Sequence, residues 1–138
     1  VVEDKVRDLT ELVQELSSPI IPVLDGIVVV PLIGKYDEDR SEALLEKTLT
    51  NLPSHKAKYV VLDLTGLNEN ISQHTASFIE KIGSASTLIG VTTILVGISP
   101  QLSIIITQSN VQLSNFDCFQ TLQHGIHYAL AQMGRRII

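Results

Sequence analysis

Three side chains of types that can do nucleophilic and acid–base chemistry lie near one another in the sequence: Asp63, Ser72 and His74. A serine hydrolase needs a histidine that takes the serine proton and a carboxylate that orients the histidine. Ser72 and His74 stand two residues apart at a predicted helix start, and side chains with that spacing do not face each other. No Gly-x-Ser-x-Gly turn surrounds Ser72. The spacing therefore argues against a catalytic triad, and we expect His74 to be solvated.

Ser72 itself has two interpretations that use the same position. As the residue before a helix, its hydroxyl can accept a hydrogen bond from a backbone N–H of the first turn, which contributes about 1 kcal/mol. A phosphate on that hydroxyl would meet free N–H groups and the positive end of the helix dipole. It would also add about two negative charges to the surface. The residues around Ser72 leave both interpretations open.

Metal and nucleotide sites have weak support. His124 and His127 stand three residues apart on the last predicted helix, without a nearby Cys or acid to complete a metal site. The glycines do not have Walker or Rossmann spacing, so no phosphate-binding loop is predicted. We expect no catalytic residue, no metal and no cofactor, and we expect the chain not to be an enzyme.

Alternating strand and helix patterns predict an α/β fold with a mixed sheet and helices on one or both of its faces. The β-branched runs at residues 20–23 and 27–33 flank Asp25-Gly26, a strong hairpin signal. Pro31 suggests an edge position or a bulge in the second run. Three further strands are expected, the first of them central and the last weak: residues 59–64, 91–98 and 116–119.

Helical patterns fill the segments between these strands. The acids Asp37-Glu38-Asp39 favour a helix start, and this helix is expected to end before Pro53. The next helix is expected to end at Gly90 and to bury a stripe of three isoleucines: Ile79, Ile82 and Ile89. Two more helices are expected at residues 100–109 and 122–133.

Residues 3–16 have the pattern of an amphipathic helix that Ser17-Ser18-Pro19 ends. Its apolar stripe could pack on its own domain or form a seam with a partner copy: Val6, Leu9, Val13 and Leu16. Because the chain has no initiator Met, we expect it to be a piece of a longer protein, with one domain after this helix.

Charge and composition restrict the classes of partner. A formal net charge of −5 without a basic cluster argues against nucleic acid and anionic membranes. No apolar run reaches the roughly 20 residues needed to cross a bilayer, and a single cysteine, Cys118, fits a reducing compartment. We therefore expect a cytoplasmic chain. Residues 82–134 contain one charged residue, Asp117, so that surface is either solvated by polar side chains or covered by another subunit.

Several segments, taken in order, match a known pattern: residues 16–23, 30–34, 61–67, 88–90 and 95–100. The Asp-Leu-Thr-Gly segment that begins at Asp63 and the Val-Gly-Ile-Ser-Pro segment that begins at Val96 are the most specific. Together they resemble the carboxy-terminal STAS domain of RsbR-type stressosome proteins, which belong to the anti-sigma-factor antagonist family. The resemblance implies a STAS fold over residues 18–138, a mixed and mostly parallel sheet flanked by helices. It also implies that residues 1–17 are a linker helix that follows an upstream sensor domain.

The resemblance implies a non-enzymatic scaffold and signalling domain of a bacterial stressosome. Such a domain binds sister STAS proteins and a switch serine/threonine kinase, forms homo-oligomers, and controls an alternative sigma factor in a stress response through phosphorylation. The alternative is a small-molecule-binding STAS sensor module, with its ligand near residues 67–72.

The resemblance also assigns roles to individual residues. Ser72 corresponds to the family's phosphoacceptor, and Ile71 stands where the family usually has Asp. The family's second acceptor corresponds to Glu38, whose carboxylate cannot accept phosphate and is either a partial mimic of it or a sign that this control is lost. The surface that would meet the kinase is implied around the phosphoacceptor: Asn68, Glu69, Asn70, Ile71, Ser72 and His74.

Overall fold

The computed structural model of the chain describes residues 20–67, 73–114 and 116–134, and its first element is a β-hairpin. β1 (Ile21–Leu24) pairs antiparallel with β2 (Ile27–Pro31). Gly26, in the turn between them, has a φ of 86°, a left-handed conformation that glycine adopts without steric cost. The hairpin predicted at Asp25-Gly26 is confirmed.

Three parallel strands extend this hairpin into a sheet with the order β1-β2-β3-β4-β5. They are β3 (Tyr59–Asp63), β4 (Thr92–Val96) and β5 (Asp117–Phe119). β3 is the central strand, and its apolar run is buried because neighbours pair with it on both sides. The predicted central strand and the weak last strand are both confirmed.

The prediction that Pro31 marks an edge position or a bulge is wrong. β2 lies between β1 and β3, and the irregular pairing lies in β1, between Pro22 and Leu24. Pro31 is the last residue of β2, and among the described residues it lies beyond the positions that pair with β1, so its missing N–H removes no hydrogen bond from the described ladder.

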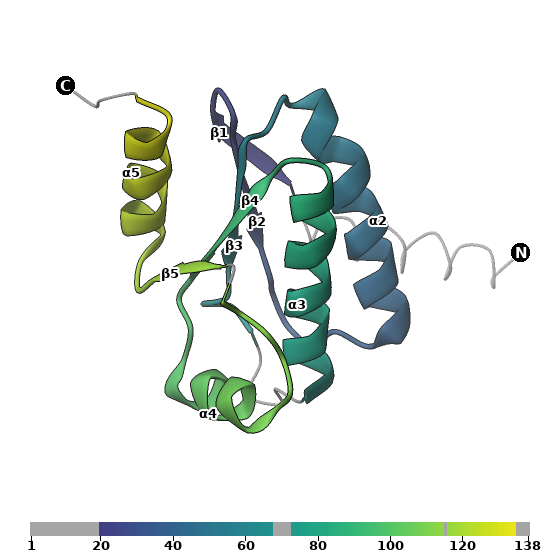
Figure 1. Ribbon diagram of the computed structural model, residues 1–138. Helices are drawn as coiled ribbons and strands as arrows, with labels where there is room; N and C mark the ends of the chain where they lie inside the picture. Colours follow the sequence, from purple (N-terminus) through teal and green to yellow (C-terminus); the bar gives the residue numbers. More distant parts are fainter. Residues whose placement is uncertain (1–19, 68–72, 115, 135–138) are drawn as a thin grey trace, which may run out of the picture.

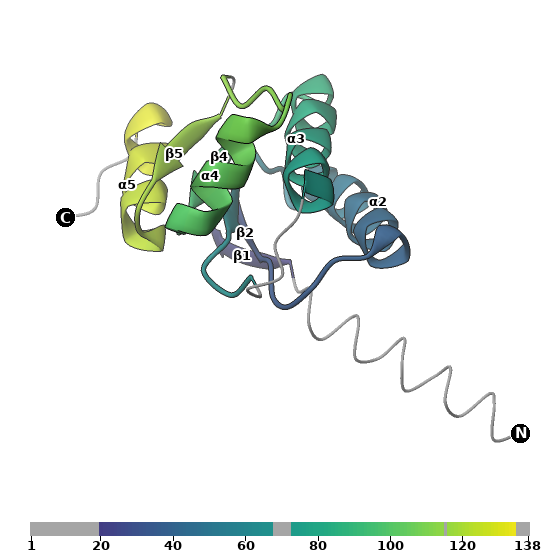
Figure 2. The same ribbon diagram turned by 90° about the horizontal axis from the view of Figure 1, so that it is seen from below.

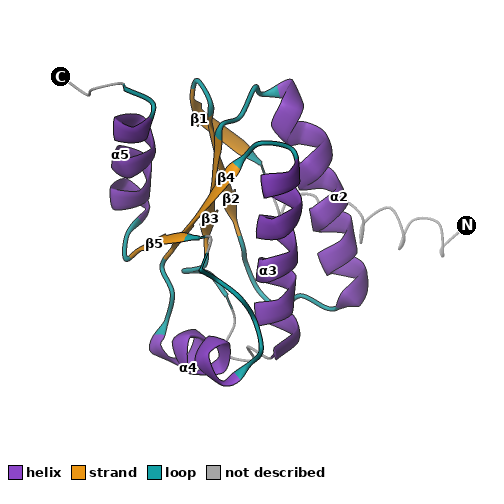
Figure 3. Ribbon diagram, in the orientation of Figure 1, coloured by secondary structure: helices purple, strands orange, loops and turns teal. Residues whose placement is uncertain are grey.

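Helices cover both faces of the sheet (Figures 1 and 3). α2 (Glu38–Ser54) and α3 (Gln73–Leu88) lie on one face, and α5 (Leu122–Gln132) lies on the other. α4 (Pro100–Gln108) lies at the carboxyl ends of the strands, toward the viewer in Figure 2. Among the helices of the described ranges, none is long and apolar enough to span a bilayer.

Local signals account for the starts of α2 and α4. The Asp37 side chain accepts a hydrogen bond of 2.8 Å from the Arg40 backbone N–H, and Ser99 caps α4 in the same way before Pro100. The predicted end of α2 before Pro53 is wrong, because Pro53 lies inside the last turn, where the φ that its ring imposes is compatible with a helix.

Each face of the sheet has its own apolar core. The core under α2 and α3 is the larger, and it includes Ile79 and Ile82, both fully buried as predicted. Ile89, predicted to share that buried face, is 46% exposed, because α3 ends at Leu88 before the stripe reaches it. The core under α5 is smaller: Ile27, Val29, Val61, Ile94, Val96, Ala129 and Leu130.

Gly125 lets α5 lie close to the sheet. A Cβ at this position would come within 2.8 Å of the Val96 side chain and 3.3 Å of the Ile94 side chain. Because residue 125 has no side chain, the α5 backbone can pack closely against β4.

Candidate functional site

The segments that follow β2, β3 and β4 lie side by side at the carboxyl end of the sheet. The Gly34 backbone N–H donates to the Gly66 carbonyl at 3.0 Å, and Gly34 and Leu67 form a parallel bridge. The Leu64 N–H donates to the Val96 carbonyl at 2.9 Å. Segments that the sequence separates by about thirty residues therefore build one edge of the molecule.

Asp63 stabilises the turn after β3. Its Oδ1 accepts hydrogen bonds from the Thr65 backbone N–H at 3.1 Å and from the Thr65 hydroxyl at 2.7 Å. Gly97 lies against the same turn, and a Cβ on Gly97 would come within 2.3 Å of the Thr65 hydroxyl oxygen. The Asp-Leu-Thr-Gly and Val-Gly-Ile-Ser-Pro segments are thus packing partners, and the Asp63 carboxylate is bonded to its own turn.

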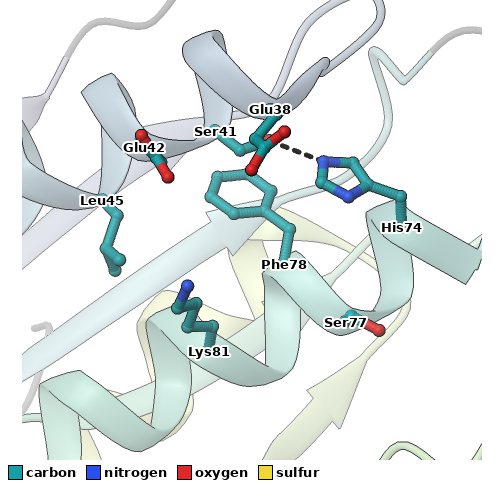
Figure 4. A pocket seen from close by; sticks show the side chains of 8 residues that line it. All are labelled: Glu38, Ser41, Glu42, Leu45, His74, Ser77, Phe78 and Lys81. Atoms are coloured by element: carbon teal, nitrogen blue, oxygen red, sulfur yellow. Dashed lines mark hydrogen bonds between the residues drawn. The ribbon is translucent and has the colours of Figure 1, made fainter.

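A pocket opens between the first turns of α2 and α3 (Figure 4). Its volume is about 180 Å³, and it brings together Glu38, the first residue of α2, and His74, the second residue of α3. We call it the α2–α3 pocket. Its lining residues are Glu38, Ser41, Glu42, Leu45, His74, Ser77, Phe78 and Lys81.

A hydrogen bond joins the two helices inside this pocket. The Nε2 atom of His74 lies 3.3 Å from the Ser41 hydroxyl oxygen. His74 is exposed, as expected, and Ser41 is buried. A serine next to a histidine is part of a hydrolase triad, but this serine is 6% exposed and no acid holds the imidazole among the described residues. The pair therefore joins α2 to α3 and is not arranged for nucleophilic attack.

The pocket carries charges of both signs above an apolar floor. Glu38 and Glu42 from α2 and Lys81 from α3 form no ion pair or hydrogen bond through their side chains within the described ranges. Leu45 and Phe78 supply the apolar surface. Such an arrangement can hold the polar end of one side chain of a partner or a very small ligand.

The loop before α2 is fixed by Tyr36 and Arg40. The Arg40 guanidinium lies 4.0 Å from the Tyr36 ring centroid and donates to the carbonyl oxygens of Ile33 and Lys35, both at 2.6 Å. The Tyr36 ring stacks on Phe78 with a centroid distance of 5.4 Å. These contacts set the position at which Glu38 enters the pocket, and no local sequence pattern indicated them.

Most of the predicted kinase-facing residues lie outside the described ranges: Asn68, Glu69, Asn70, Ile71 and Ser72. The residues on either side of that segment are Leu67, at the carboxyl end of the sheet, and Gln73, the first residue of α3. Of the predicted site residues in the described ranges, the structure brings Glu38 and His74 together in one pocket.

The histidines of α5 do not belong to this site. His124 and His127 are exposed on the helix that covers the opposite face of the sheet. Within the described ranges, no three His, Cys, Asp or Glu side chains are close enough together to hold a metal ion.

Comparison with known proteins supplies the family. The family model of the STAS domain matches residues 18–125. RsbT co-antagonist protein RsbRA of Bacillus subtilis (strain 168) is 34% identical over 125 residues, which are 91% of this chain and 45% of that protein. A blue-light photoreceptor of Listeria monocytogenes is 29% identical over 88% of this chain and 47% of its own length. The chain therefore spans less than half the length of these curated relatives.

Solved structures agree on the fold. A variant of RsbS from Moorella thermoacetica superposes with a TM-score of 0.72 at 24% identity, covering 86% of this chain and 98% of that chain. A chain of the stressosome, described as a signal integration and transduction hub, gives a TM-score of 0.68 at 22% identity, covering 86% and 100%. The predicted STAS fold is confirmed. With its family match, its sheet order and its identity to the co-antagonist proteins, the chain belongs to the STAS domain family.

Proposed function

We propose that this chain is the signalling domain of a stressosome-type scaffold, which docks a switch serine/threonine kinase and sister STAS domains and is not itself an enzyme. The observation that carries the proposal is the 34% identity to an RsbT co-antagonist protein over 91% of the chain. The scaffold forms homo-oligomers and mixed oligomers in the cytoplasm and controls an alternative sigma factor.

The positions of Glu38 and His74 support the carboxyl end of the sheet as the docking surface. Both lie at helix starts and line the α2–α3 pocket, and both are exposed. Ser72 immediately precedes α3, so a phosphate there would lie near the positive end of the helix dipole. The added charge would repel an acidic partner surface and would cost desolvation on docking.

The test of this proposal is capture of an RsbT-type kinase by the full chain, followed by Mg-ATP and intact mass. We expect one phosphate to be added to the wild type and none to Ser72→Ala. Ser72→Ala should retain kinase binding, and Ser72→Asp should weaken it at least about fivefold. Gln123→Glu is the control, because it adds the same charge at an exposed position of α5, on the other face of the sheet. No capture by the wild type would refute the kinase role, and equal binding by the two Ser72 variants would refute the phospho-switch.

Glu38 gives a second test at the same surface. If its carboxylate stands in for a phosphorylated acceptor, Glu38→Thr should gain a second phosphate from the kinase and should change kinase capture. Glu42→Thr is the matched control, one turn further along α2 and also exposed. If neither variant is phosphorylated nor altered in capture, Glu38 is an ordinary first-turn acid that favours the helix dipole.

A small-molecule-binding module is the second candidate function, and the α2–α3 pocket is the observation that favours it. Its volume of about 180 Å³ admits only a very small ligand, and its buried polar side chain, Ser41, already has a partner in His74. We therefore rank this function below kinase docking. A ligand there should shift the amide resonances of Ser41 and Ser77, and His74→Ala should remove the shift.

A further inference from the structure

A second cavity lies on the other side of α3 from the α2–α3 pocket. Its volume is about 210 Å³, and it is bounded by α3, β4 and the stretch between α4 and β5. Figures 1 and 2 show that stretch running alongside α3. We call it the α3–β4 cavity. Its lining residues are Glu80, Gly83, Ser84, Thr87, Thr93, Gln112 and Phe116.

Two contacts hold the walls of this cavity together. The Phe116 ring packs directly on the α3 backbone at Gly83, where a Cβ would come within 1.8 Å of the ring. The Gln112 backbone N–H donates to the Glu80 carboxylate and ties the same stretch to α3. These contacts between elements of the chain therefore fix the walls of the cavity.

Thr93 is, among the described residues that line this cavity, the buried polar side chain without a hydrogen-bond partner. Its side chain is 3% exposed and lines the cavity, and its hydroxyl oxygen makes no hydrogen bond within the described ranges. Burying a hydroxyl without a partner costs free energy, which a ligand hydroxyl in the cavity would recover.

Other hydroxyls reach the same space. The Ser84 hydroxyl has no hydrogen-bond partner among the described residues, and the Thr87 hydroxyl donates to the Gly83 carbonyl and keeps lone pairs to accept. The Glu80 carboxylate is a further acceptor, and Phe116 adds an apolar wall.

We propose that the α3–β4 cavity binds a small neutral polyol, no larger than a single sugar ring. Among the described residues, the lining contains no Lys, Arg or His to hold an anion, and Glu80 disfavours one. Hydroxyls that both donate and accept match the hydroxyls of a polyol, and the wall of Phe116 matches its C–H groups. The volume of about 210 Å³ suits a ligand of this size.

This inference does not depend on kinase docking, because the two hollows lie on opposite sides of α3. The α2–α3 pocket uses His74, Ser77 and Lys81, whereas the α3–β4 cavity uses Gly83, Ser84 and Thr87. Loss of one function therefore leaves the other measurable.

The test is a titration of the full chain, labelled with ¹⁵N, with myo-inositol and with D-ribose. We expect saturable shifts of the amide resonances of Ser84, Thr93 and Gln112 with a dissociation constant of about 1 mM. Thr93→Val, which replaces the hydroxyl by a methyl of similar size, should weaken binding about fivefold or more. Thr48→Val is the matched control: it removes another buried, unpartnered hydroxyl, on α2 and outside the cavity.

Ser84→Ala decides the matter if Thr93→Val does not fold, because Ser84 is exposed and its loss should not affect folding. It should weaken binding by about threefold or more. The proposal is overturned if neither probe shifts these resonances, or if the shifts map to another surface. It is also overturned if Thr93→Val binds the probes as tightly as the wild type. Should Thr93→Val not fold, unchanged binding by Ser84→Ala overturns it.

Discussion

Gly97 is the residue at which two of the matching sequence segments depend on each other. Its φ of 73° is left-handed, and its missing Cβ makes room for the Thr65 hydroxyl, which in turn binds Asp63. Gly90 has a similar φ of 82°, but nothing lies within 4 Å of where its Cβ would be. A substitution at Gly90 therefore tests only the need for a left-handed backbone. A substitution at Gly97 tests that need together with the close contact to Thr65.

Gly90→Ala should lower the free energy of unfolding by about 1 kcal/mol, the cost of a left-handed alanine. Gly97→Ala should lower it by at least about 1 kcal/mol more, because its methyl also collides with the turn at Thr65. Urea denaturation of the two variants measures the difference. Equal losses of unfolding free energy in the two variants would mean that the turn at Thr65 moves to accept the methyl group without an energetic cost.

The surroundings of Cys118 make its thiol a weaker acid. Desolvation by burial, and second the Asp117 carboxylate, raise the pKa of the Cys118 thiol above its ordinary value, although the residue is exposed. Since the thiolate is the reactive form, iodoacetamide at pH 8 should alkylate the folded chain more slowly than the chain in urea. Asp117→Asn should speed the folded reaction by lowering that pKa. A folded rate equal to the rate in urea would contradict the prediction.

At the level of elements, α5 alone covers its face of the sheet within the described ranges, and it does so through Gly125. Gly125→Ala should gain about 1 kcal/mol from helix propensity. It should lose about 1 to 3 kcal/mol by forcing a methyl against Val96 and Ile94. We expect a net loss of stability in thermal and urea unfolding.

Ala131→Gly is the control for this prediction, because residue 131 is exposed on the same helix. It should lose about 1 kcal/mol through helix propensity alone. If Gly125→Ala instead stabilises the chain by that amount, α5 does not lie as close to β4 as the structure places it.

Elements with local signals could be predicted from the sequence. Asp25-Gly26 marked the hairpin and Ser99-Pro100 the start of α4, because the residues that fix these features are neighbours in the chain. The end of α2 beyond Pro53 and the exposure of Ile89 were missed, because each depends on where the backbone of a helix stops making hydrogen bonds.

The α2–α3 pocket was only half predictable. Glu38 and His74 were selected one by one, but the hydrogen bond of His74 joins it to Ser41, 33 residues earlier in the chain. The contact between Gly83 and Phe116 is of the same kind. No period or spacing within either segment encodes such pairs, because they arise only when two elements pack together.

At the scale of the whole molecule, self-association remains a prediction, because residues 1–16 lie outside the described ranges. Their stripe of Val6, Leu9, Val13 and Leu16 should form a seam between copies. Light scattering of the full chain should report a dimer or a larger species, and removal of residues 1–16 should reduce it. A full chain that stays monomeric at high concentration would rule this out.

A point substitution refines that experiment. Leu9→Lys places a charge in the stripe, whereas Thr10→Lys adds the same charge next to it. Only Leu9→Lys should dissociate the species seen by light scattering. If both variants lower the mass measured by light scattering equally, charge repulsion and not the apolar stripe controls the association.

The strand order described above also has a consequence for how the domain folds. Every strand pairs with the strand that precedes it in the chain, so each new unit of strand and helix docks on an edge that is already present. Each parallel strand is added by closing one crossover of the chain, so no step requires two strands that are distant in the sequence to pair first. We therefore expect the domain to form from its amino end, with amides of β2 and β3 protected in pulse-labelled hydrogen exchange before those of β5. In a longer protein, such a domain can complete most of its sheet while its last helix is still being synthesised.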